Sequence, residues 1–319
     1  MFDTIKNINL QLFAEMNTQV TTSGDLSPEM KTFYSDYLID NAQPKMVHDQ
    51  FGQKHPIPKN GGKIIEFRKF SPLGKLLTPL VEGVTPDGQS LAVTTIEATV
   101  AQYGGYITLS DMLLLTAIDN NMVQATKLLG QQAGATLDTI TREVLNGGTN
   151  VIYAGGVNSR SALADNLTVE DIKKAARALK TQNAEKIGDS YVAIIHPDVA
   201  FDLTNDPTWQ NVKDYDPKDW YEGEIGRIAG VRFVETTEAK IFDGGVYSTL
   251  VLADNAYGVT EIEGGGLQHF TKQLGSGGTS DPLDQRATVG WKATKVAERL
   301  VEQFMVRIES KCTFNGAAN

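Results

Sequence analysis

Histidine and cysteine often serve as bases, nucleophiles and metal ligands, and this chain has only four histidines and one cysteine. His48 and His55 lie in a proline-broken stretch with no second pair of ligands spaced with them, so both are expected to be solvated. His196 follows a short apolar run, and no nucleophile or orienting group is spaced with it, which indicates a structural role. Cys312 has no paired histidine and is expected to be an inert thiol. The sequence therefore predicts no catalytic residue, no metal site and no cofactor.

The motifs that identify common enzyme classes are also missing. The sequence has no G-x-S-x-G elbow, no H-E-x-x-H pair and no Walker A loop. Gly155 and Gly156 lack the G-x-G-x-x-G spacing of a dinucleotide site. The run Gly264 to Gly266 is not followed by the lysine and hydroxyl residue of a phosphate-binding loop. We therefore expect a protein that is not an enzyme.

One segment, residues 206–224, combines acidic and aromatic side chains and could form a calcium site or a ligand cleft. Its spacing does not fit an EF-hand loop, since Lys218 interrupts the alternation of oxygen ligands. We interpret it as a solvated loop whose aromatic residues seat it on the core. A ligand-binding module built on this segment stays open as an alternative function. Its members are Asp206, Asp214, Asp216, Asp219, Glu222 and Glu224, with Trp209, Tyr215, Trp220 and Tyr221.

Composition limits the class of protein. The chain has 319 residues, 41% hydrophobic and 21% charged, as expected for a protein with a sizeable core. Its net charge of −10 does not favour a surface that binds nucleic acid. A single cysteine excludes an intramolecular disulfide framework and indicates synthesis in a reducing cytoplasm. No run approaches the roughly 18 apolar residues of a membrane span, and residues 1–15 resemble a short amphipathic helix rather than a signal peptide.

The element expected to organise the chain is a long helix over residues 108–148. Thr108 or Ser110 can cap its start, and the asparagine and two glycines at 146–148 favour its end. At 1.5 Å per residue the helix would be roughly 50 Å long. Two interior glycines, Gly130 and Gly134, predict a gentle bend or a close backbone contact. The apolar stripe consists of Leu114, Ile118, Met122, Ala125, Leu129, Ala133, Leu137, Ile140 and Val144.

Residues 61–107 are expected to form a long β-hairpin. Alternating residues predict strands over 63–70 and 93–103, and the segment between them has too many prolines and glycines for a helix or a central strand. A two-stranded hairpin is marginal in water, so it is expected to lie on a neighbouring subunit or domain. Residues 17–60 have little periodicity and are interpreted as an arm that lies on another surface.

The remainder predicts a mixture of helices and strands, and hence the α+β class. A capping box at Thr168 opens a helix that runs to about Leu179 or Lys180. A buried strand over 191–195 is followed by a short helix starting at Pro197. Further strands are expected at 230–236, 246–254, 257–263, 287–294 and 300–308.

This order of elements, an arm, a hairpin, a long helix, a mixed α/β region and a returning strand, resembles the Hong Kong 97-type major capsid protein of tailed bacteriophages. Several stretches are similar to the branch related to the podovirus N-four major capsid protein. These stretches are NLQLFAE, EFRKFSPLGKLLTPLVEGVTPDG, ATVAQYGGYITLSD, LLGQQAGATLD, TREVLNGGTNVIYAGG and DPLDQRATVGWK. The resemblance implies an N-terminal arm (1–60), an extended loop (61–107), a peripheral domain (108–184) with its spine helix (108–148), an axial domain (185–280) and a return to the peripheral domain with a C-terminal tail (281–319).

The resemblance also implies a function. It implies a structural subunit that self-assembles into pentamers and hexamers of an icosahedral shell around double-stranded DNA, without a membrane partner. Scaffolding protein, portal and decoration proteins are implied partners, and the virion, assembled in the host cytoplasm, is the implied location. Some relatives crosslink a lysine of this loop, but no partner asparagine is identifiable for Lys69 or Lys75, so no crosslink is expected here. An encapsulin-like bacterial nanocompartment shell of the same fold remains an alternative.

Overall fold

The computed structural model describes the chain from residue 46 to its end with short gaps, together with two residues of the N-terminal region. The described residues are 18–19, 46–70, 73–80, 82–83, 85, 87–117, 121–209, 226–278, 281–314 and 316–319. The helix expected over residues 1–15 lies outside them. The chain divides into two compact units. Unit 1 contains residues 1–43, 103–133 and 267–293, and unit 2 contains residues 44–102, 134–266 and 294–319.

Unit 2 is built around a seven-stranded mixed sheet. Strand β6 pairs in parallel with β15, and β7 pairs in parallel with β9, whereas β8 pairs antiparallel with β9 and β11 pairs antiparallel with both β7 and β15. Both central strands β7 and β11 are buried along their whole length, as expected for the middle of a covered sheet. The strand order is β6 (Val151–Tyr153), β15 (Met305–Ser310), β11 (Val246–Leu252), β7 (Tyr191–Ile195), β9 (Val231–Glu235) and β8 (Arg227–Ile228), with β10 (Ile241–Phe242) paired to β11.

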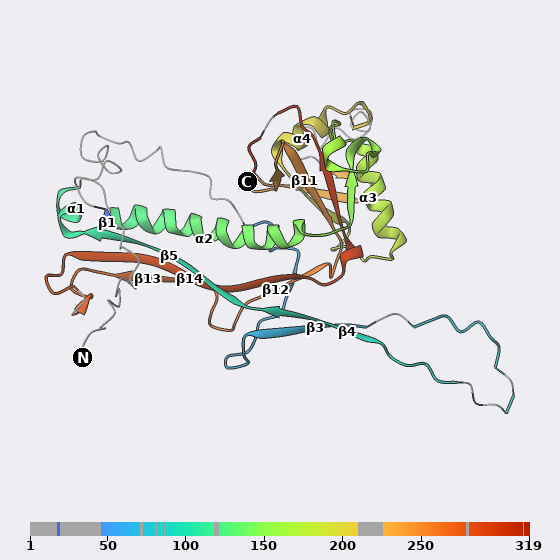
Figure 1. The fold of residues 1–319 in the computed structure, drawn as a ribbon, viewed down its shortest axis with the longest axis horizontal. Helices are drawn as coiled ribbons and strands as arrows, with labels where there is room; N and C mark the ends of the chain where they lie inside the picture. Colours follow the sequence, from blue (N-terminus) through green and yellow to red (C-terminus); the bar gives the residue numbers. More distant parts are fainter. Residues whose placement is uncertain are drawn as a thin grey trace, which may run out of the picture. The chain divides into compact units, whose positions relative to one another are not determined.

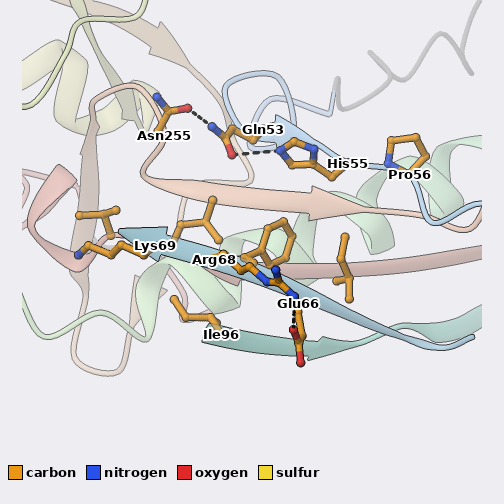
Figure 2. Close-up of a pocket in the computed structure, with 12 residues that line it drawn as sticks. Gln53, His55, Pro56, Glu66, Arg68, Lys69, Ile96 and Asn255 are labelled. Carbon is orange, nitrogen blue, oxygen red and sulfur yellow. Dashed lines mark hydrogen bonds and ion pairs between the residues drawn. The ribbon is translucent and has the colours of Figure 1, made fainter. Parts of the chain in front are cut away.

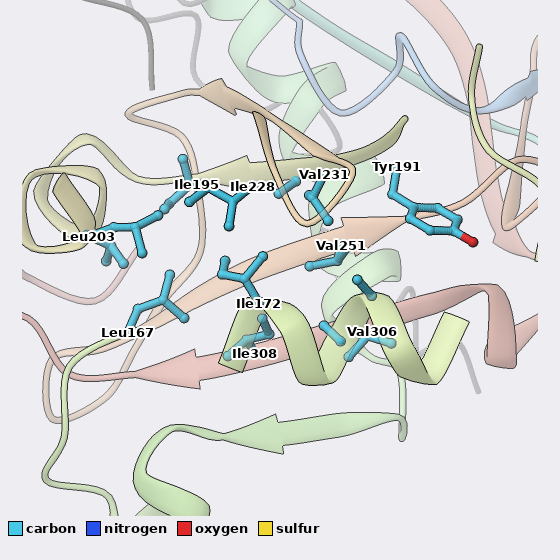
Figure 3. Close-up of a cluster of buried hydrophobic side chains, with 14 of the residues drawn as sticks. Leu167, Ile172, Tyr191, Ile195, Leu203, Ile228, Val231, Val251, Val306 and Ile308 are labelled. Atoms are coloured by element: carbon cyan, nitrogen blue, oxygen red, sulfur yellow. The ribbon is translucent and has the colours of Figure 1, made fainter. Parts of the chain in front are cut away.

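Helices α3 (Val169–Thr181) and α4 (Pro197–Thr204) cover this sheet. Thr168 caps α3 by accepting from the Asp171 backbone N–H, which confirms the predicted capping position. Figure 3 shows Ile172 of α3 among strand residues such as Val251 and Ile308, and all three are buried. Short 3₁₀ turns at η3 (Ala154–Gly156), η4 (Arg160–Ala162) and η6 (Glu302–Phe304) connect the elements.

A second group of strands in unit 2 carries the hairpin. Strand β12 (Tyr257–Thr260) pairs antiparallel with the last residues of β14 (Arg286–Arg299) and parallel with β2 (Gln53–Lys54). The hairpin itself consists of β3 (Ile64–Phe70) and β4 (Val93–Thr99), paired without interruption from Ile64↔Thr99 to Phe70↔Val93. Figure 1 shows the two strands side by side and continuing into a long loop. The predicted hairpin is confirmed, although its second strand ends at Thr99.

Unit 1 contains β5 (Ala101–Ser110), β1 (Thr18–Gln19), β13 (Gln268–Lys272), the first part of β14 and α1 (Asp111–Thr116). Strands β13 and β14 pair antiparallel over 268–272 and 288–292. Strands β5 and β14 approach so closely that a Cβ atom at Gly104 would lie 2.7 Å from the Trp291 carbonyl oxygen. Glycine at this position therefore permits the two strands to pack.

The prediction of one continuous helix over 108–148 is wrong. Residues 108–110 belong to β5, Ser110 caps the short α1, and α1 ends at the extended residue Ala117. A separate helix, α2, spans Asn121–Asn146 and ends at the predicted asparagine. The predicted strand over 300–308 is also wrong, because η6 separates β14 from β15 there. Strand β14 is longer than expected and β12 is shorter.

Candidate interaction surface

The long loop between β3 and β4 exposes a concentration of leucine side chains. Leu76 is 75% exposed, Leu77 85% and Leu80 77%. Leu73 and Leu91, nearer the strands, are also more than half exposed. A contiguous apolar surface is rare on a protein that stays monomeric and marks a place where another surface binds. The loop therefore has the chemistry of a docking segment.

An aromatic side chain of the hairpin packs on β12. Phe67 of β3 lies over Gly258 of β12, where an added Cβ atom would come within 2.9 Å of its ring. The same hypothetical Cβ atom would lie 3.6 Å from Leu300. His55 also meets Phe67 edge-on, with 5.9 Å between the ring centroids. Glycine at 258 thus creates the space that seats the hairpin.

A pocket of about 530 Å³ lies beside this contact, at the root of the hairpin. Figure 2 shows Gln53 between two partners: its amide nitrogen donates to Asn255, and its amide oxygen accepts from His55 Nε2 at 3.2 Å. The walls mix polar and apolar groups. They consist of Gln53, His55 and Pro56, of Ile65 to Lys69 with Ile96, and of Asn255, Leu300 and Val301. The pocket lies between β3 and residues 53–56, and the His55–Phe67 contact joins the same two segments.

Residues 46–57, which we call the strap, are anchored in unit 2 by a buried pair of side chains. His48 and Asp138 of α2 are both only 1% exposed. The His48 Nδ1 atom lies 2.6 Å from Asp138 Oδ2, and the His48 backbone N–H donates to Asp138 Oδ1 at 2.8 Å. The expectation that His48 is solvated is therefore wrong, because a carboxylate distant in sequence binds its Nδ1 atom and its backbone N–H inside the core.

An ion pair lies next to this contact. Lys295 of β14 binds the Asp49 carboxylate and also donates to the Leu137 carbonyl oxygen at 2.7 Å. Thr141 donates to the other Asp49 oxygen. Burial lowers the pKa of Lys295, and the Asp49 carboxylate opposes that shift. The strap thus contributes one residue to each of two adjacent polar contacts, one with α2 and one with β14.

Tyr257 of β12 covers the strap. Its hydroxyl donates to the His48 carbonyl oxygen, and its ring lies against Gly52, where an added Cβ atom would be only 2.5 Å from the ring. Burial raises the pKa of Tyr257 well above its usual range. The strap continues alongside β12, since the Ile57 N–H donates to the Glu261 carbonyl at 2.8 Å. Because these contacts fix its backbone along its length, the strap is part of the folded unit and not a loose arm.

A further buried carboxylate holds the edge of the main sheet. Glu309 of β15 is fully buried and accepts two hydrogen bonds from Arg160, at 2.6 and 2.7 Å. Arg307 lies 2.9 Å from the same carboxylate. The hydrogen bond to Glu309 raises the pKa of Arg160, whereas burial lowers the pKa of Arg307. Charge compensation explains why three ionised side chains can share this site.

The other residues considered from sequence have structural surroundings. His55 is exposed apart from its contacts with Phe67 and Gln53. His196 caps α4 by accepting from the Asp198 backbone N–H at 3.2 Å, and burial lowers its pKa. Burial raises the pKa of Cys312 to about 12, which keeps the thiol protonated and unreactive.

The acidic and aromatic segment lies mostly outside the described residues, which stop at 209 and resume at 226. Of its members, Asp206 accepts from the Val169 N–H at the start of α3, and Trp209 is buried in the core of unit 2. No group of three or more potential metal ligands occurs among the residues that the structure describes. No helix in that same part of the chain is long and apolar enough to cross a membrane.

Comparison with known proteins gives one family. A family model described as phage capsid protein matches residues 93–303. No curated protein matches the chain. Among solved structures, the capsid of the cyanophage P-SCSP1u superposes with a TM-score of 0.69 at 14% identity, covering 92% of this chain and 96% of that one. The capsid of Ralstonia phage GP4 has a TM-score of 0.68 at 15% identity, covering 94% of this chain and 99% of that one. The capsid of cyanophage Pam1 has a TM-score of 0.67 at 14% identity, covering 90% of this chain and 95% of that one.

Proposed function

This chain belongs to the phage capsid protein family, and we propose that it assembles with copies of itself through the apolar loop between β3 and β4. It is a major capsid protein of a tailed phage, a structural shell protein of the virion and not an enzyme. Its fold is the Hong Kong 97-type α+β fold expected from the sequence. A nanocompartment shell and a ligand-binding module are not favoured by these comparisons.

The exposed leucines carry the proposal that the loop binds a neighbouring subunit. Fully burying one leucine stabilises a complex by about 1.5–3 kcal/mol relative to leaving it exposed. The loop presents several such side chains at 73–80 and 91, and none of them is buried within the subunit. The hairpin below them is two-stranded and gains stability from burial against another chain. A repeated contact of this kind between different surfaces of identical subunits closes into rings.

We propose that the subunits form the pentamers and hexamers of an icosahedral shell. In this arrangement, residues 1–60 are the N-terminal arm, 61–107 the extended loop and 108–184 the peripheral domain. Residues 185–280 are the axial domain, and 281–319 return to the peripheral domain. Support for the loop boundaries comes from β3 and β4, which lie within 61–107, and the spine corresponds to α2, which ends at Asn146.

We also propose double-stranded DNA as the content of the shell, with scaffolding, portal and decoration proteins as further partners and the host cytoplasm as the place of assembly. The net charge of −10 supports a wall that does not bind DNA tightly. Non-specific DNA affinity arises from cationic side chains that displace counterions from phosphates, and this chain has fewer basic than acidic residues.

Paired substitutions at the loop test the role of the leucines. We expect Leu76→Asp/Leu77→Asp to leave the subunit folded, because both side chains are exposed, and to abolish particles seen by electron microscopy. The matched control is Leu76→Met/Leu77→Met, which keeps the apolar surface and should still give particles. Normal particles from the aspartate variant would exclude the loop as the main contact. Loss of circular dichroism in that variant would instead show that the leucines stabilise the subunit itself, which also contradicts the proposal.

A further inference from the structure

The strap and the extended loop meet at two consecutive residues of one strand. Tyr257 of β12 covers the strap through its ring and hydroxyl, and Gly258 receives Phe67 of the loop. Successive residues of a strand face opposite sides. The strap at Gly52 and the loop at Phe67 therefore press on β12 from opposite faces at adjacent positions.

Neither contact leaves room for an additional atom. An added Cβ atom at Gly52 would lie 2.5 Å from the Tyr257 ring, and one at Gly258 would lie 2.9 Å from the Phe67 ring. Close-packed side chains transmit displacement because they cannot be compressed. A shift of the strap therefore moves Tyr257, and a shift of Tyr257 moves the backbone on which Phe67 rests.

The strap also pairs directly with β12, because Gln53 of β2 lies opposite Gly258. Beside the pocket, His55 of the strap meets the Phe67 ring edge-on. Both contacts join the strap to the seat of the hairpin at Gly258. A two-stranded hairpin that loses its seat also loses the packing that keeps its own hydrogen bonds closed.

We propose that the strap fixes the orientation of the extended loop through Tyr257 and Gly258, so that releasing the strap loosens the root of the loop. The coupling is a property of the single subunit. Its consequence for the shell rests on the proposed function: the strap, which is the last part of the N-terminal arm, would control how the docking loop is presented to a neighbour. Coupling of this kind is reciprocal, because a coupling free energy between two contacts acts equally in both directions.

Hydrogen exchange in dilute, full-length, unassembled subunits tests the coupling. Gly52→Ala forces the Tyr257 ring away, and we expect amides at 64–70 and 93–99 to exchange at least about five-fold faster, the lower end of typical coupling. Amides of the core strands β7 and β11 should keep their native rates. If Gly52→Ala does not fold, Tyr257→Phe makes the same test, because it removes only the hydroxyl that binds the strap.

Thr168→Ala is the matched control. It removes the side-chain cap of α3 and leaves the strap and the loop unchanged. Equal acceleration of loop exchange in this control would mean a global effect and would overturn the proposal.

The reverse experiment uses Phe67→Ala, which should accelerate exchange at strap residues 48–57. Unchanged strap exchange in that variant would also overturn the coupling, because linkage requires both directions. The coupling and the proposed function fail separately. Unchanged hydrogen exchange refutes the coupling and says nothing about assembly. Normal particles from the aspartate variant of the loop leucines refute the proposed contact and say nothing about the coupling.

Discussion

Replacing Lys295 by methionine is expected to destabilise unit 2 strongly, although lysine and methionine have similar length and both suit a buried stem. The substitution removes the partner of the Asp49 carboxylate and keeps Asp49 itself inside. Breaking a buried ion pair from one side costs about 3–5 kcal/mol, because a charge remains without compensation. Thr141 continues to donate to Asp49, so we expect the lower end of this range, about 3 kcal/mol.

The structure also predicts that the ion pair as a whole contributes little net stability. Burial lowers the pKa of Lys295, which means that the folded protein pays a desolvation cost to keep the ammonium charged. Removing both charges in Asp49→Asn/Lys295→Met should therefore cost much less than the sum of the two single substitutions. A coupling energy of at least about 1 kcal/mol is expected for two groups in direct contact.

Urea unfolding of the native chain, both single variants and the double variant measures this cycle. We expect the native chain to unfold at the highest urea concentration. The double variant should have a slightly lower midpoint, and both single variants should have much lower midpoints. The reasoning is refuted if Lys295→Met loses less than about 1 kcal/mol, or if the double variant loses the sum of the two single losses.

Three further predictions follow from other buried groups. Cys312, whose pKa burial raises to about 12, should react with maleimide on the order of a thousandfold more slowly than an exposed thiol at neutral pH, because its thiolate fraction is lower by that factor, and rapid labelling without unfolding would contradict this. Burial lowers the pKa of His196, so below about pH 6.5 the unfolded chain binds more protons than the folded chain, and stability decreases as the pH decreases. His196→Asn retains the cap and should weaken this pH dependence. An unchanged slope of urea midpoint against pH in that variant would be inconsistent with this reasoning. Glu309→Gln leaves Arg160 and Arg307 without a counter-charge and should cost about 3 kcal/mol in urea unfolding, so a neutral effect would refute the role given to that carboxylate.

Local patterns predicted the elements whose stabilising contacts are local. The alternation over 63–70 and 93–99 places Ile65 and Phe67 on the less exposed face of β3, and the hairpin forms in that register. The capping residue Thr168 correctly marks the start of α3, because its hydrogen bond reaches only three residues along the chain. In the same way, Pro197 correctly marks the start of α4.

Periodicity alone could not reveal the break between α1 and α2. The apolar stripe continues in phase across Leu114 and Met122, and two helices in the same phase give the same pattern as one. The start was misplaced because 101–110 continue as a strand that pairs with β1 and packs closely on β14, a tertiary preference that local caps do not report. At 300–308, alternating residues similarly conceal the 3₁₀ turn between two strands.

The strap was missed for a different reason. Its sequence is irregular and polar, and its order comes from partners far along the chain. His48 binds a carboxylate 90 residues away, and Asp49 binds a lysine 246 residues away. No periodic signal within 46–57 reports such contacts. A histidine followed directly by an aspartate, between two apolar residues, Val47 and Phe51, was the available hint that this segment has a buried side.

The exposed leucines of the extended loop also have a consequence for the newly made chain before it finds its neighbours. Apolar, extended segments of this kind are prone to stack into cross-β fibres when they have strong β-propensity and no proline. Here Pro72, Pro79 and Pro86 interrupt the loop at regular intervals, and each proline-free stretch between them contains a glycine and a charged residue. Such residues act as gatekeepers, since proline cannot donate to a growing β-ladder. The loop can thus remain adhesive toward a folded neighbour while being a poor template for fibres, and replacing its prolines to stiffen it would remove that protection.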